Sequence, residues 1–112
     1  MKKVEAIIRP EKLEELREAL DAKGFHGMTV TEVKGRGKQK GITLEWRVGE
    51  YRVEFMPKIK LEMVIEEKNL STVIEIITSI CSTGSMGDGK IFISPIEEVI
   101  RISSKEQGPK AL

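Results

Sequence analysis

Apolar and polar residues alternate in several short segments of the chain, which is the spacing of a strand that buries one face. The clearest case is residues 3–9, where Val4, Ala6 and Ile8 would share a face. The expected strands are residues 3–9, 28–34, 58–66, 90–94 and 98–102, the last two on either side of Pro95. These segments predict a sheet of short strands.

Two further segments have the spacing of amphipathic helices. The first begins at Pro10, which suits a first helical turn, and Gly24 can terminate it. The second can be capped by Asn69 and ended by Gly84. Their apolar faces consist of Leu13, Leu16 and Leu20 in the first and Leu70, Val73, Ile74, Ile77, Ile80 and Cys81 in the second.

The order of these elements is β-α-β, a long loop, β-α-β and a small extra strand. This order predicts an α+β, ferredoxin-like βαββαβ fold, with an antiparallel sheet and both helices on one face. No clean helix or strand fills the segment from Lys34 to Pro57. The uncovered face would carry Ile7, Val64 and Phe92 among charges, so we expect oligomerisation to cover it.

The composition describes one domain of 112 residues with 39% hydrophobic and 33% charged residues. A net charge of +1 argues against a general nucleic-acid binder. We expect no signal peptide and no membrane insertion, because no apolar run reaches the length of a span. With a single cysteine, these features predict a cytoplasmic protein.

Two loops mix glycines with cations, residues 35–41 and residues 83–90. Glycine lets backbone N–H groups approach an anion, and Lys or Arg supplies charge, so the pair predicts a phosphate-bearing ligand held from two sides. Gly84 to Lys90 has P-loop spacing, but Ile91 stands where Mg²⁺ binding requires Ser or Thr. The loop also follows a helix and precedes a strand, so a P-loop enzyme is rejected.

Several longer segments carry a resemblance that is more specific than either loop. They are Lys3-Val4-Glu5-Ala6-Ile7-Ile8-Arg9-Pro10, Gly27-Met28-Thr29-Val30-Thr31-Glu32-Val33-Lys34-Gly35, Gln39-Lys40-Gly41, Pro57-Lys58, Thr83-Gly84 and Gly87-Asp88-Gly89-Lys90-Ile91-Phe92. Through them the chain resembles the PII family of nitrogen-regulatory signal transducers over residues 1–112, as a single domain.

The resemblance implies a homotrimer without catalytic activity, with ATP and ADP competing for the clefts between subunits. With MgATP bound, 2-oxoglutarate would bind beside the triphosphate and reshape a T-loop over residues 37–55. This loop would then control partners such as the ammonium channel or enzymes of glutamine synthesis. The protein would be cytoplasmic, peripheral to the membrane only when bound to such a channel, with a flexible tail over residues 103–112.

The resemblance also implies roles for individual residues. The nucleotide would be bound by Ile7, Thr29, Gly35, Arg36, Gly37, Lys38, Val64, Gly87, Asp88, Gly89, Lys90 and Arg101. The 2-oxoglutarate site would comprise Gln39, Lys40, Gly41, Lys58 and Gly87, with the Gln39 amide oxygen on Mg²⁺. Tyr51 falls on a position uridylylated in many bacterial members, and Trp46, Arg47 and Tyr51 would contact partners.

Three positions depart from the family pattern. Ser103 stands where many members have a second phosphate-contacting Arg, Lys38 replaces a frequent Arg, and Ser85 replaces a frequent Lys. Lysine gives up the bidentate geometry of arginine.

Two other functions remain open at this point. A phosphotransfer enzyme on the same fold would use His26 or Lys90, and a metal-tolerance trimer would bind metal without nucleotide. Cys81 is expected to be a small core residue, and Asp88 to order its turn through side-chain hydrogen bonds.

Overall fold

The computed structural model describes residues 1–37, 42–46 and 49–112, with the backbone alone for 42–46 and 49–53. The elements are β1 (Lys2–Ile8), α1 (Leu13–Ala22), β2 (Thr29–Gly35), β3 (Ile42–Trp46), β4 (Gly49–Val53), β5 (Met56–Ile65), α2 (Leu70–Cys81) and β6 (Lys90–Pro95). Short 3-10 turns cover Pro10–Lys12, Glu67–Asn69 and Gly108–Ala111.

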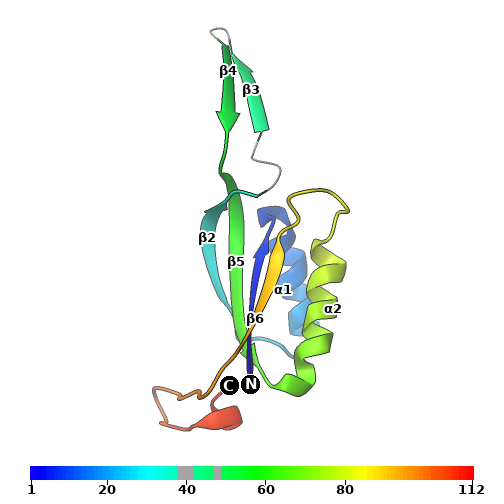
Figure 1. Cartoon of the computed structure of the whole chain (residues 1–112). Coiled ribbons are helices and arrows are strands. Elements are labelled where there is room, and N and C mark those ends of the chain that lie inside the picture. The colour runs from blue at the N-terminus through cyan, green and yellow to red at the C-terminus, as the bar shows by residue number, and fades with distance from the viewer. Residues whose placement is uncertain (38–41, 47–48) are drawn as a thin grey trace.

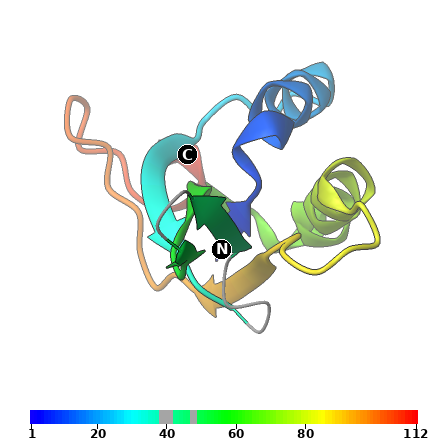
Figure 2. The same ribbon diagram turned by 90° about the horizontal axis from the view of Figure 1, so that it is seen from above.

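One antiparallel sheet organises the molecule, with the strand order β2-β5-β1-β6. Both helices cover the same face of this sheet (Figures 1 and 2). The predicted ferredoxin-like α+β fold is therefore confirmed.

The core lies between this face and the helices, and the alternation in the sequence identifies it. Val4, Ala6 and Ile8 of β1 are all at most 2% exposed. They pack with alternate residues of β5 and with the apolar stripes of both helices, including Leu16, Leu20, Leu61, Val73 and Ile77.

The opposite face of the sheet, which we call the open face, is covered by no helix of the described residues. Glu5 and Phe92 lie opposite each other on β1 and β6, and Phe92 is 53% exposed. Lys60 Nζ lies 3.5 Å from a Glu5 carboxylate oxygen and 3.3 Å from one of Glu62. The open face thus combines a ladder of charges with exposed apolar side chains, as the sequence predicted.

The long segment between β2 and β5 contains two strands that the sequence analysis did not predict. β3 and β4 pair antiparallel, from Ile42 opposite Val53 to Trp46 opposite Gly49. They form a separate hairpin that extends beyond the end of the four-stranded sheet (Figure 1). Our prediction of a long loop without regular structure was wrong for this part.

The ends of several elements also differ from prediction. Asn69 does not cap α2, since it ends a 3-10 turn in the αR region and makes no capping side-chain bond. The helix ends at Cys81, where Ser82 N donates to Thr78 O, rather than at Gly84.

No strand forms over residues 98–102, where Ile100 makes only an isolated bridge with Gln107. The chain turns back on itself there, and Gly108–Ala111 forms a 3-10 helix with Ala111 buried. In the part of the chain that the structure describes, no helix is long and apolar enough to cross a membrane.

Candidate functional site

The loop of residues 83–90 connects α2 to β6, and Asp88 closes it on itself. One carboxylate oxygen of Asp88 accepts hydrogen bonds from Thr83 N at 2.8 Å and Gly84 N at 3.1 Å. The other accepts from Thr83 Oγ1 at 2.5 Å. The predicted ordering of this turn by Asp88 is confirmed, with the bonds reaching back to the start of the loop.

Two cations anchor the loop to the sheet. Arg9, just after β1, donates from Nε to Asp88 at 3.0 Å and from Nη2 to Met86 O at 2.7 Å. Lys58 of β5 donates from Nζ to Gly87 O at 2.6 Å. The loop is therefore held by one side chain that directly follows β1 and one from β5.

Gly89 lies directly against the backbone of β1. Its φ is +96°, and a Cβ built there would lie 1.7 Å from Ile7 O. No side chain fits in that space, and few non-glycine residues adopt such a φ. Gly89 therefore sets how closely the loop approaches β1.

These contacts and burial shift the pKa values of two groups of the site, Asp88 and Lys58. Hydrogen bonds from Thr83, together with those from Arg9 and Gly84, hold the pKa of Asp88 well below its usual range. Burial lowers the pKa of Lys58, and the nearby charge of Arg9 lowers it further. Asp88 is thus held as a carboxylate, whereas the Lys58 ammonium loses its proton more readily than that of an ordinary lysine.

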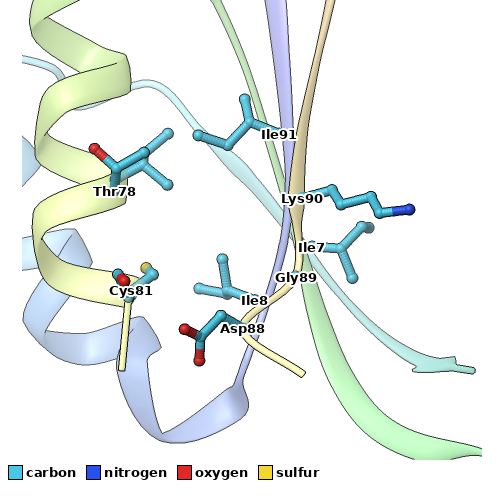
Figure 3. A pocket seen from close by; sticks show the side chains of 10 residues that line it. Ile7, Ile8, Thr78, Cys81, Asp88, Gly89, Lys90 and Ile91 are labelled. Atoms are coloured by element: carbon cyan, nitrogen blue, oxygen red, sulfur yellow. The ribbon is translucent and has the colours of Figure 1, made fainter. Parts of the chain in front are cut away.

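Several predicted nucleotide residues share the open face. Ile7 lies opposite Lys60 and Lys90, Thr29 opposite Glu62, and Val64 opposite Lys3. Figure 3 shows the Ile7 and Lys90 side chains on the side of the sheet away from α2. Gly35, at the end of β2, approaches Lys58, because a Cβ there would lie 3.2 Å from Lys58 Cγ.

Arg101 is not brought to this group. It belongs to the segment after β6, at the end of the sheet remote from the loop of residues 83–90 (Figure 1). Its guanidinium donates to Leu112 O at 3.0 Å.

The remaining predicted residues lie in the first loop and the hairpin. Arg36 and Gly37 are exposed just after β2. The predictions for Lys38, Gln39, Lys40, Gly41 and Arg47 lie outside the described residues, and for Trp46 and Tyr51 the structure gives only the backbone positions in β3 and β4.

Two hollows flank the site. One, of about 320 Å³, lies between α2 and the strands β1 and β6. Its lining combines core residues such as Ile8, Ile77, Cys81 and Ile91 with the predicted nucleotide residues Ile7, Asp88, Gly89 and Lys90. Figure 3 shows the Ile7 and Lys90 side chains directed to the other side of the sheet, away from α2. The other, of about 490 Å³, is lined by Lys58 with Pro10, Glu32, Val33, Lys34, Pro57 and Ile59.

Cys81 is 4% exposed, and burial raises the pKa of its thiol to about 11. Because the thiolate is the reactive form, we predict negligible alkylation of the native protein by iodoacetamide at pH 8, and full alkylation in denaturant. Mass spectrometry measures both. Stoichiometric labelling of the native protein would show that Cys81 is accessible.

His26, the candidate nucleophile of a phosphotransfer enzyme, lies in the turn after α1. Its Nδ1 is 3.0 Å from an Asp21 carboxylate oxygen, and its side chain is 72% exposed. Among the described residues, no three His, Cys, Asp or Glu side chains are grouped so as to hold a metal ion.

Arg9 and Thr83 belong to the segments that resemble the family, but sequence reasoning assigned neither of them a role in the site. Arg9 lies 79 positions from Asp88 in the chain, and only the fold brings them together. The available signal was the charge of Arg9 directly after a buried strand.

Comparison with known proteins gives a family match over most of the chain. A family model described as "Nitrogen regulatory protein P-II" matches residues 1–106. Nitrogen regulatory protein P-II 2 from Methanothermobacter thermautotrophicus is 54% identical over 112 residues, covering 100% of this chain and 97% of that protein. Nitrogen regulatory protein P-II from Rhizobium meliloti is 54% identical and that from Azospirillum brasilense 52%, each over the full length of both chains.

Proposed function

Since the chain belongs to the nitrogen regulatory protein P-II family, we propose that it binds ATP and ADP at the loop of residues 83–90 and transmits their ratio to partner proteins. The observation that carries this proposal is the shape of that loop. Asp88 closes it, Arg9 and Lys58 anchor it, and Gly89 sits where no side chain fits. Such a loop can present backbone N–H groups to phosphate, and Lys90 adds charge.

The second ligand of the proposal is 2-oxoglutarate. Lys58 would exchange its bond to Gly87 O for a bond to one carboxylate, which is the stronger, charge-assisted partner. Lys58 and Lys34 both line the second hollow, together with Glu32, and the two cations support the proposal that a dicarboxylate enters there. Gln39 would hold Mg²⁺ through its amide oxygen, an oxygen ligand of the kind that this ion prefers. Lys40 and Gly41 would complete the dicarboxylate site.

The hairpin of β3 and β4 would be the output element. It is connected to one of the anchoring cations, because β4 leads within three residues into β5, where Lys58 lies. A ligand that reorders residues 37–41 would therefore change how the hairpin leaves the domain. Trp46, Arg47 and Tyr51 would contact an ammonium channel or an enzyme of nitrogen metabolism, and Tyr51 would be the modified residue if a uridylylating enzyme exists.

We propose that three copies assemble over the open face. This face exposes Phe92, and the segment after β6 exposes Ile102 at 95%. A neighbouring copy would also supply Arg101, which lies at the far end of its own sheet. We predict a sedimentation mass three times the 12.6 kDa of one chain. A monomer at micromolar concentration would contradict this.

The affinity for 2-oxoglutarate should depend on pH through Lys58. Its pKa lies below the 10.5 of an unperturbed lysine, and only the protonated ammonium attracts a carboxylate. We predict that affinity falls as pH rises from 8 toward 10, at lower pH than an ordinary lysine would require. Calorimetry with saturating MgATP measures this. In Lys58→Arg the cation stays charged over this range, so the decline should disappear.

The nucleotide proposal is tested by titrating ATP and ADP while following the fluorescence of Trp46, the only tryptophan. Chromatography of the same samples measures hydrolysis or phosphorylated protein. We expect saturable binding without turnover. Absence of binding would overturn the proposal, and stoichiometric phosphoryl transfer that requires His26 would favour a phosphotransfer enzyme.

A further inference from the structure

The Asp88 carboxylate has no free oxygen within the structure described above. One oxygen accepts from the two backbone N–H groups of Thr83 and Gly84, and the other from the Thr83 hydroxyl and Arg9 Nε. Each oxygen thus already has two donors. A carboxylate in this state has little capacity left to bind a ligand, so its effect must come through the groups that it holds.

The direction of the side chain supports the same reading. Figure 3 shows Asp88 pointing toward the C-terminal end of α2, whereas Lys90 points to the opposite side of the sheet. Gly89, with φ +96°, separates the two residues and turns the backbone between them. A phosphate held by Lys90 would therefore not face the Asp88 charge, which is balanced by Arg9 at 3.0 Å.

Arg9 adds a second restraint at the middle of the loop. Its Nη2 binds Met86 O at 2.7 Å, while Lys58 binds the next carbonyl, Gly87 O, at 2.6 Å. Carbonyl oxygens repel phosphate, so a phosphate-binding loop needs its carbonyls directed elsewhere. Two consecutive carbonyls are here directed to cations, one of which is itself fixed by Asp88.

We propose that Arg9, Thr83 and Asp88 form a clasp whose role is to hold the loop of residues 83–90 in the shape that receives a polyphosphate. All three act here through their side chains as positioning residues, and the Asp88 carboxylate is not a contact of the nucleotide. The inference rests on the proposed function, since it concerns the same nucleotide site. It assigns the Asp88 side chain a different role from the direct nucleotide contact that the resemblance implied.

The direction in which Asp88→Asn changes ATP affinity distinguishes this positioning role from a purely electrostatic effect of the Asp88 charge. Asp88→Asn removes a negative charge near the phosphates, which by charge alone should strengthen ATP binding. In the clasp, the amide NH₂ would face a donor and one side of the network would open. We therefore expect ATP affinity to fall about tenfold or more, as for the loss of one charge-assisted hydrogen bond. Adenosine, which carries no phosphate, should bind within about twofold of its original affinity.

The matched control is Asp21→Asn. Asp21 also accepts a hydrogen bond from an Arg and lies 3.0 Å from His26 Nδ1, but on α1, away from the loop. It should leave both affinities unchanged. A general loss of folding would lower the affinity for adenosine and for ATP together. A loop released from its clasp would lower the affinity for ATP alone.

A second pair of variants keeps the test decisive if Asp88→Asn does not fold. Thr83→Val removes the hydroxyl that binds Asp88, and Thr83→Ser keeps it. We expect weaker ATP binding in the first and recovery in the second. ATP affinity that rises in Asp88→Asn, or that Thr83→Val leaves unchanged, would overturn the inference alone. Failure of the unaltered protein to bind ATP would overturn the proposed function and this inference with it.

Discussion

Replacing Gly89 with alanine is expected to reduce affinity for ATP and ADP by at least about 100-fold, the equivalent of losing two charge-assisted hydrogen bonds. The added Cβ would lie 1.7 Å from Ile7 O, and that atom belongs to a strand paired on both sides. The strand cannot move without breaking the sheet, so the loop must move instead. Lys90 and the backbone of residues 87–89 would then leave their positions together. Isothermal titration calorimetry measures the change.

Gly84→Ala is the matched control for this substitution. Gly84 also has a positive φ, +81°, but nothing lies within 4 Å of a Cβ placed there. Alanine at Gly84 should therefore show the strain of the backbone alone, of order 1–3 kcal/mol in stability, with a smaller loss of affinity. Equal effects of the two substitutions would show that the contact with Ile7 is not what matters.

Replacing Lys58 with methionine is expected to weaken 2-oxoglutarate binding by roughly 10- to 150-fold, since it removes one ion-paired hydrogen bond of about 1.5–3 kcal/mol. Methionine keeps the length of the side chain and its packing beside Gly35, but it has no charge. ATP affinity should fall less, because Arg9 and Asp88 still hold the loop. The measurement is calorimetry of 2-oxoglutarate at saturating MgATP.

Lys60→Met tests whether any lysine of β5 would have the same effect. Lys60 is two residues further along the strand and faces the same side, but its charge is already shared with Glu5 and Glu62. It should leave the affinity for 2-oxoglutarate within about twofold. A loss as large as that of Lys58→Met would indicate a general electrostatic effect of the open face.

Periodicity predicted the parts of the fold in which one face is buried. Val4, Ala6 and Ile8 alternate, and Leu16 and Leu20 repeat at helical spacing, and all five are buried. The prediction of a strand over residues 98–102 was wrong because these residues have no neighbouring strand to pair with in the described parts of the chain. Their composition suits a strand, but a strand needs a partner, and the chain offers Ile100 only Gln107. Sequence pattern describes a segment, whereas pairing depends on the rest of the fold.

The hairpin was missed for a different reason. Ile42, Leu44 and Trp46 alternate with Thr43 and Glu45, so a strand signal is present. The glycines and cations of residues 35–41, directly before this segment, are typical of irregular structure. The alternation over residues 42–46 predicts a strand when these residues are considered apart from the glycine- and lysine-rich loop before them.

The two glycine–cation loops could be found from composition, because the chemistry of phosphate binding limits which residues serve it. The contacts that hold the loop of residues 83–90 could not be predicted from the sequence. The contacts of Arg9 and Lys58 with Asp88, Met86 and Gly87 join positions 29 to 79 residues apart. Nothing in local sequence specifies which cation reaches which carbonyl.

If the proposed function is correct, this protein binds 2-oxoglutarate only when MgATP is bound. The most direct measurement is a calorimetric titration of 2-oxoglutarate into protein saturated with MgATP, and into protein saturated with ADP. We predict saturable binding in the first case and none in the second, with a coupling of at least about tenfold. Equal binding in both, or no binding in either, would contradict the account.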